Sequence, residues 1–390
     1  MLKKMLWVAS LLWVPTLGMA SDFEYELGTT IIAQSPNKAK ALMDKSATAS
    51  VDVLVDWSFG TAGTLHAYVE ASTQADITAN TLVAGSNMDA GTALNKKGKG
   101  RVQISELFYS YNFADDDAGP TLSAGVILLQ GFADETEISN AEQTHFIAAP
   151  LVNNSSIPFP DYTPAIVLSS DDKDVAWRVM VANAYGLADN ANMDYADLFK
   201  FSNGAGTPSK GLFSLAQMRL SLDDDTSIAI GAWVSTKELA RHTGAGTKQG
   251  AVGSYINVDS VITESILWSG RLGYTSSKET MEVVSFASVA FNYQYNDEFT
   301  VGLGTAYHGL SNEFRNTFVA PNVGANPIVL ELYASWQITD WVSVMPDIQY
   351  WRNPNNLSAS AVGTVSKSAV VYGLRLQFGY IPKTHVIDES

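Results

Sequence analysis

Polar and apolar residues alternate along most of this 390-residue chain. The alternation divides into about sixteen segments, and a period of two is typical of β-strands because successive side chains point to opposite faces of a sheet. The clearest segment is 370–380, where one face is apolar and the other mostly polar. Its apolar face carries Val370, Tyr372, Leu374, Leu376, Phe378 and Tyr380.

The pattern predicts sixteen strands, of which 23–32 and 253–260 show the alternation least clearly. They are expected at 23–32, 48–58, 64–72, 101–113, 119–129, 162–169, 174–183, 212–222, 227–235, 253–260, 266–275, 285–295, 299–308, 330–338, 342–350 and 370–380.

The connections between these segments alternate between long and short. Short turns are expected near Gly60, Asp116, Asp172, Asp224, Thr263, Asp297 and Asp340. One rim of tight turns and one rim of large loops is typical of an outer-membrane barrel. The sequence therefore predicts an all-β fold, a transmembrane antiparallel up-and-down β-barrel of about 16 strands with short periplasmic turns and long extracellular loops. A barrel of this size encloses a water-filled channel.

The first twenty residues are typical of a secretory signal. Lys3 and Lys4 precede an apolar run that is too short to span a membrane as a helix, and small residues end the segment at Ala20. We expect a signal peptide at 1–20, a barrel at 21–380 and a C-terminal tail at 381–390, in the bacterial outer membrane. The alternative is that the first segment remains as an N-terminal anchor.

Charge and composition narrow the possible functions. The formal net charge is −16 and there is no cysteine. Nucleic-acid binding needs a basic surface and is not expected, and disulfides and thiolate metal sites are excluded. The mean hydropathy of +0.02 suits strands that face lipid on one side and water on the other.

The sequence carries no clear catalytic or metal-binding motif. The five histidines are scattered without an HExxH pattern. The acidic clusters 115–117, 171–174 and 223–225 fall at expected short turns, where Asp commonly forms turns. We therefore expect no enzymatic activity, no metal and no cofactor, although distant strands could still assemble a hydrolase site.

Several charged and aromatic side chains occupy the polar face of their strands and are expected to face the channel. A charge on the lipid side would cost a few kcal/mol near the middle of the bilayer. These side chains either bind a passing solute or form a generic polar wall. The charged candidates are Glu70, Glu106, Arg178, Arg219, Arg271, Glu331, Asp347 and Arg375, and the aromatic ones are Tyr68, Phe108, Trp233 and Tyr333.

The connection 130–161 is the best candidate for a loop that folds into the channel. It is long, and the run Asn153–Pro160 makes its end apolar and stiffened by proline. It either forms a constriction that limits solute size or packs on neighbouring outer loops.

Three stretches of the chain resemble the carbohydrate-selective porins of the OprB type. They are "ISELFYSYNF" with the following "THFIAAPLVNNSSIPFPDYTPAIVL", "LGTAYHGLSNEFR", and "IVLELYASWQITDWVSVMPDIQYWRNP" with "VVYGLRLQFGY". The resemblance covers most of residues 104–380. It implies a sixteen-stranded outer-membrane barrel through which sugars diffuse passively. Unlike such barrels, which usually end on an aromatic residue, this chain continues after Tyr380 with "IPKTHVIDES".

The expected partners are small sugars as permeating solutes, outer-membrane lipids and the barrel-assembly machinery, with a homo-oligomer possible. Two alternatives remain open at this point. The acidic composition would also suit a general or cation-leaning porin for small solutes. A soluble secreted β-rich sugar-binding protein would belong to a different class.

Overall fold

The computed structural model describes residues 22–37, 46–73, 83, 85–88, 93, 99–114, 119–187, 195–199, 211–244, 246–318, 326–354 and 368–379. The expected signal peptide, the C-terminal tail and the turn near Asp116 lie outside these residues.

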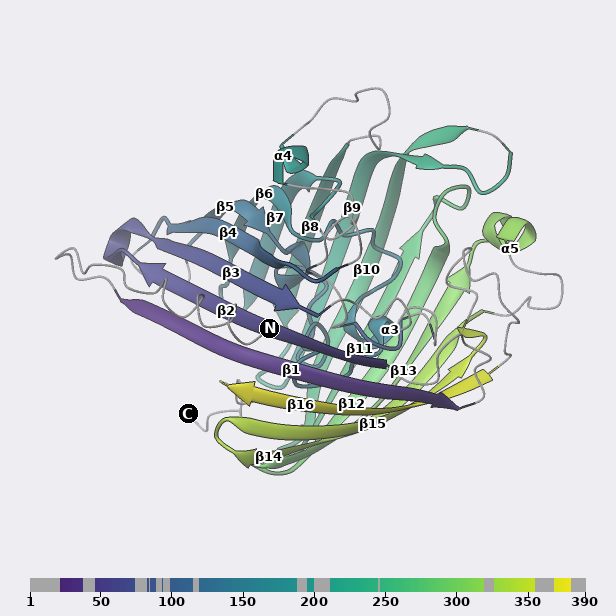
Figure 1. Ribbon diagram of the computed structural model, residues 1–390. Helices are drawn as coiled ribbons and strands as arrows, with labels where there is room; N and C mark the ends of the chain where they lie inside the picture. The colour runs from purple at the N-terminus through teal and green to yellow at the C-terminus, as the bar shows by residue number, and fades with distance from the viewer. Residues whose placement is uncertain are drawn as a thin grey trace.

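Sixteen antiparallel strands close into one barrel, in which each strand pairs with its neighbours in sequence and β1 pairs with β16 (Figure 1). Closure leaves no open sheet edge, so the backbone amides of every strand can pair within a membrane. The strands are β1 Phe23–Asn37, β2 Ser46–Ser58, β3 Thr64–Ser72, β4 Val102–Asn112, β5 Thr121–Ile127, β6 Thr163–Ser170, β7 Val175–Asn183, β8 Leu212–Ser221, β9 Thr226–Ala240, β10 Thr247–Thr263, β11 Ile266–Thr275, β12 Val283–Asn296, β13 Phe299–Leu310, β14 Ile328–Thr339, β15 Val342–Arg352 and β16 Ser368–Gly379.

The predicted strands all occur, but the two with the weakest pattern are longer than expected. β1 runs to Asn37, and β10, at 17 residues, extends well beyond the predicted 253–260. Because β9 also runs on to Ala240, the connection between β9 and β10, expected at 236–252, is only 241–246. The outer face of β10 carries Ser254 and Ser260 among its apolar residues, and its inner face carries Gly253 and Tyr255, so the two faces differ little in hydropathy.

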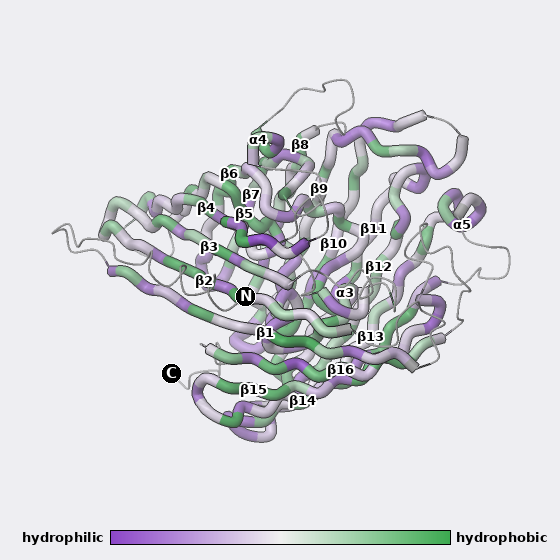
Figure 2. Tube along the Cα trace, viewed as in Figure 1, coloured by the Kyte–Doolittle hydropathy of each residue, from purple (hydrophilic) through white to green (hydrophobic). Residues whose placement is uncertain are grey.

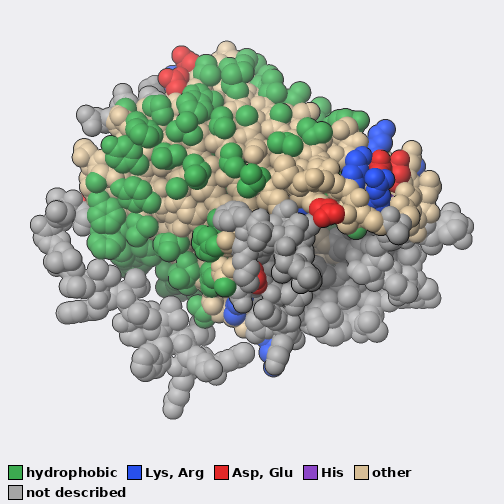
Figure 3. Space-filling view, turned by 90° about the horizontal axis from the view of Figure 1, so that it is seen from above, with side chains coloured by type: hydrophobic (Ala, Val, Ile, Leu, Met, Phe, Trp, Pro, Cys, Tyr) green, Lys and Arg blue, Asp and Glu red, His purple; other side chains and the backbone are tan. Residues whose placement is uncertain are grey.

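The outer face of the barrel is apolar. Alternate positions along most strands carry exposed large hydrophobic side chains, such as Leu303 on β13 and Leu332 on β14. The alternation is visible along the tube in Figure 2, and Figure 3 shows one outer face covered mainly by hydrophobic side chains. In water such a surface would promote association, whereas in a bilayer it contacts hydrocarbon.

The remaining elements are short. They are the 3-10 turns η1 Gly60–Ala62 and η2 Leu129–Gly131 and the helices α3 Ala149–Val152, α4 Tyr195–Leu198 and α5 Asn312–Phe318. None of the helices in the described residues is long and apolar enough to cross a membrane.

The core of the molecule lies inside the barrel, between the wall and the segment 128–162. One cluster packs Phe146 and Leu151 of this segment against Phe286 and Tyr333 of the wall. A second packs Leu129 and other residues of the segment against the inner faces of β6–β10. The segment expected to fold into the channel is therefore an internal structural element.

Candidate functional site

The segment 128–162 enters the barrel between β5 and β6 and reaches far across its height. The Glu137 N–H donates to the Asp259 carboxylate at 3.1 Å, and Asp259 lies only four residues before the end of β10. The Arg219 guanidinium donates to the Glu135 carbonyl at 3.1 Å, near the end of β8. The tip of the segment thus lies near the rim of short turns.

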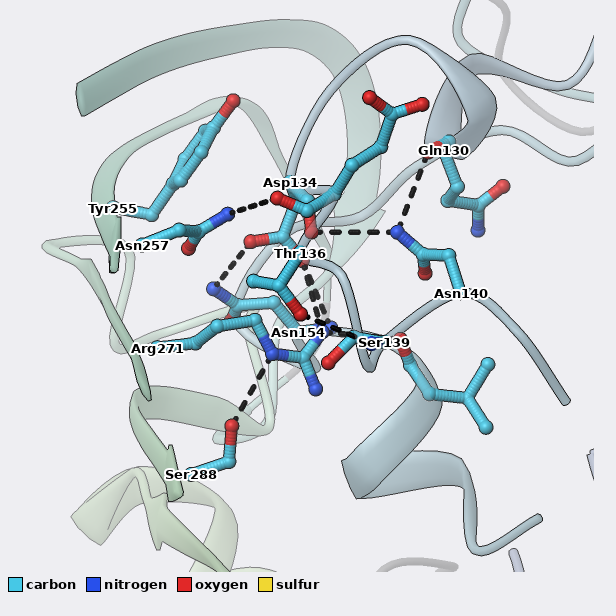
Figure 4. A network of polar contacts seen from close by, with 12 residues as sticks. Gln130, Asp134, Thr136, Ser139, Asn140, Asn154, Tyr255, Asn257, Arg271 and Ser288 are labelled. Carbon is cyan, nitrogen blue, oxygen red and sulfur yellow. Dashed lines mark hydrogen bonds and ion pairs between the residues drawn. The ribbon is translucent and has the colours of Figure 1, made fainter. Parts of the chain in front are cut away.

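Arg271 of β11 holds the helix α3 from its C-terminal side. The buried guanidinium donates to the carbonyls of Pro150, Leu151 and Val152 at 3.0–3.2 Å. The same group pairs with Asp134 at 3.4 Å, as Figure 4 shows. Carbonyls that end a helix have no partner within it, so a cation there satisfies them and complements the helix dipole.

Glu331 of β14 holds the other end of α3. Its two carboxylate oxygens accept the N–H groups of Ile147 and Ala148 at 3.0 and 2.9 Å, just before the helix begins. Arg375 of β16 donates to the carbonyls of Glu142 and His145. Three buried charges on separate strands therefore fix one short stretch of the segment.

Asp134 connects these contacts within the segment. Its carboxylate accepts the backbone and side-chain N–H groups of Asn154 at 3.2 and 3.3 Å, and its own N–H donates to Gln217. Burial raises the pKa of Asp134 to about 6, while Arg271 and the Asn154 contacts oppose the rise. Burial also lowers the pKa of His145 to about 4, and nearby Arg375 adds to the effect.

The segment approaches the wall closely where the wall has glycine. A Cβ on Gly273 would lie 2.1 Å from Ser156 Oγ, and one on Gly304 would lie 2.9 Å from the Phe146 ring. By contrast, a Cβ on Gly28 of β1 would have no neighbour within 4 Å. The segment is thus packed against the β11–β13 side, and space remains beside Gly28 of β1.

Seven of the twelve candidate residues are buried. Glu331, Arg271 and Arg375 bind the segment, as described, and Tyr333 packs edge-on against Phe146. Glu70 accepts a hydrogen bond from Tyr162, Asp347 accepts one from Gln349, and Trp233 stacks on Phe213. The buried set comprises Glu70, Arg271, Glu331, Asp347, Arg375, Trp233 and Tyr333.

The other five candidates, Tyr68, Glu106, Phe108, Arg178 and Arg219, are half-buried. Three of them are neighbours on the inner face of β3 and β4, where Tyr68 lies opposite Glu106 and next to Phe108. Glu106 also accepts the Leu128 N–H at 2.9 Å, at the start of the segment. Arg178 lies apart from this group and is paired with Asp171 at 2.6 Å.

Sequence reasoning missed several residues beside this group. His66 stacks on Phe108, with ring centroids 4.5 Å apart, and pairs with Asp56 at 2.6 Å. Leu54 occupies the same face of β2, opposite Tyr68, and 42% of its surface is exposed. Strand parity would have found Asp56, His66 and Leu54. No periodic signal marks Asp134 or His145 within the segment.

The described residues contain no group of three or more His, Asp or Glu side chains that could hold a metal ion. What the inner face of β2–β4 offers is a partly exposed surface of aromatic rings, hydroxyl groups and carboxylates. Such a surface can bind a polar solute weakly through hydrogen bonds and ring contacts.

A closed sixteen-stranded barrel with an apolar outside, a charged inside and an inserted segment defines a porin. The model of the OprB family of carbohydrate-selective porins matches residues 49–380. The chain belongs to this family. The resemblance seen in the sequence is thereby confirmed.

Solved structures support the fold. An engineered mutant of the Rh. blastica porin superposes with a TM-score of 0.56 at 11% identity, covering 92% of this chain and 100% of that one. A triple mutant of the Rhodopseudomonas blastica porin gives 0.53 at 10% identity with the same coverage. No curated protein matches the sequence.

Proposed function

We propose that the protein lies in the bacterial outer membrane and that neutral sugars diffuse through it along the inner face of β2–β4. The family makes it a carbohydrate porin. Partial exposure supports this path: the side chains of Tyr68, Glu106 and Phe108 are half-buried, whereas most candidates elsewhere on the wall are buried.

The accessible face has the chemistry that weak sugar binding requires. Carboxylate and hydroxyl groups can replace part of the water around a sugar, and the Phe108 ring can cover its apolar face. Binding must stay weak enough for release, so a few such groups suffice. No covalent step is needed to move a sugar down its gradient.

The buried charges have a different proposed role. Arg271, Glu331 and Arg375 hold the segment 128–162 in place and do not contact the solute. The segment then narrows the channel and limits solute size. The short turns would face the periplasm. Insertion by the barrel-assembly machinery and a homo-oligomer belong to the same proposal.

Reduction of single-channel current by added glucose tests the path. Phe108→Ala removes a ring from the inner face, and loss of a stacking contact of about 0.5–1.5 kcal/mol corresponds to a roughly two- to tenfold weaker block. Tyr109→Ala is the matched control, because Tyr109 is the next residue on β4 and lies on the outer face. Equal effects of the two substitutions would contradict the proposed path.

A preference for cations is a second candidate property. Glu26, Asp56 and Glu106 lie on the inner face of β1, β2 and β4. In the described part of the chain, none of them has a lysine or arginine at ion-pair distance. Such a wall concentrates cations near the path.

A further inference from the structure

An open groove of about 460 Å³ lies on the outer face of the barrel, at the rim of short turns. Its walls are the rings of Tyr293 on β12, Phe299 on β13 and Trp336 on β14. Tyr295 lies at its end near the turn 297–298, and Glu298 is part of that turn. The groove faces away from the channel and has no part in the proposed sugar path.

The strand register explains why the surface is hollow here. Val301 lies opposite Tyr293 on one side and opposite Ala334 on the other. Phe299 lies opposite Trp336, and this pair is two residues nearer the turn than Val301 and Ala334. Val301 and Ala334 are smaller than the Phe299 and Trp336 pair beside them, so the surface is lower at this level, farther from the turn.

The groove combines aromatic faces with a carboxylate. Tyr295 and Trp336 are 69% and 54% exposed, and Glu298 is exposed beside them. The Glu298 N–H donates to the Asn296 side chain at 3.0 Å, which shapes the turn. The residues that line the groove include no lysine, arginine or histidine.

This combination selects for a cation. Aromatic faces attract ammonium groups, and a nearby carboxylate adds charge attraction. An aromatic girdle at the membrane interface accounts for the rings alone. It does not account for a hollow that joins a carboxylate at the rim to a small apolar floor nearer the bilayer centre.

We propose that this groove binds a phospholipid with an ammonium headgroup, of the phosphatidylethanolamine type. The ammonium lies at Glu298 between Tyr295 and Trp336, and one acyl chain lies over Val301 and Ala334. The groove is large enough for the headgroup and the beginning of one acyl chain, and the rest of the lipid would lie in the bilayer.

Native mass spectrometry with equal amounts of phosphatidylethanolamine and phosphatidylglycerol tests the proposal. The purified protein should retain phosphatidylethanolamine several-fold better. Glu298→Gln should bring the ratio of the two lipids close to one, and Glu298→Asp should keep the preference. Trp336→Ala should reduce retention of both lipids.

Asp340→Asn and Trp341→Ala are matched controls, because these residues form the next short turn and do not line the groove. Both should behave like the wild type. Heat-dependent gel mobility checks that each variant forms the barrel. Equal retention of the two lipids by the wild type, or an unchanged preference in Glu298→Gln, would overturn the proposal. So would a Trp336→Ala variant that dissociates an oligomer while its lipid retention stays the same.

Discussion

At the scale of single residues, the charged side chains inside this barrel either hold the inserted segment or line the proposed sugar path. Strand parity in the sequence predicted which faces carry Arg271, Glu331 and Arg375, but it could not show that these side chains are covered. Their partners are backbone groups of a segment more than a hundred residues away in sequence. Contacts of that kind leave no periodic trace in the sequence.

Arg271→Ala should strongly destabilise the inserted segment. The change leaves Asp134 and three carbonyls without their buried cation, and breaking a buried pair costs about 3–5 kcal/mol. We expect a larger and noisier single-channel conductance and a lower free energy of unfolding. Arg241→Ala is the control, because its ion pair with Glu279 is exposed and pairs of this kind contribute little to stability. Identical conductance in Arg271→Ala and wild type would contradict the holding role.

Acid should weaken the segment through His145. Burial lowers the pKa of His145 from 6.5 to about 4, so the unfolded chain binds a proton that the folded chain resists. Neutral His145 therefore contributes about 3 kcal/mol to the free energy of unfolding. This contribution is complete above pH 6.5 and is lost as the pH falls toward 4.

Urea unfolding at pH 7.5 and 4.5, compared between wild type and His145→Gln, measures this effect. The comparison is needed because burial raises the pKa of Glu135 to about 7, which acts in the opposite direction. The variant should lose less stability than the wild type on acidification. Equal losses would show that His145 does not contribute.

At the scale of elements, the strands could be predicted because a strand between lipid and water must alternate. β11 was predicted with its observed bounds, Ile266–Thr275. On β10, Ser254 and Ser260 interrupt the apolar outer face and Tyr255 stands on the inner face, so the two faces differ little and the same rule underestimated the strand. Insertion of the connection expected at 130–161 was one of two alternatives from the sequence, and the residues that anchor it could be identified only from the fold.

Two glycine substitutions should distinguish the part of the wall that the segment contacts from the part beside β1 that it does not contact. Gly273→Ala places a methyl group against Ser156 and Asn154, and overpacking of this kind costs about 1–3 kcal/mol. The segment should shift, which raises the size limit for sugars in liposome swelling assays. Gly28→Ala adds the same methyl group where nothing lies within 4 Å and should leave uptake unchanged. If both substitutions acted alike, the space would not lie beside β1.

At the scale of the whole molecule, the acidic inner face should make the channel prefer cations. The reversal potential in a potassium chloride gradient should show this preference for the wild type. Asp56→Asn combined with Glu106→Gln should reduce it, because both carboxylates lie on the accessible face. Asp224→Asn, in an exposed turn between β8 and β9, is the control. An unchanged potential in the double variant would remove these carboxylates from the path.

The central claim is that sugars cross the barrel inside, beside β2–β4. The chain has no cysteine, so single cysteines can be introduced without background labelling. Leu54 on the inner face and Leu303 on the outer face are similarly exposed, at 42% and 46%. Uptake of glucose into liposomes should fall sharply when Leu54→Cys is labelled with a bulky thiol reagent and should not change when Leu303→Cys is labelled. Full uptake through labelled Leu54→Cys would contradict the account.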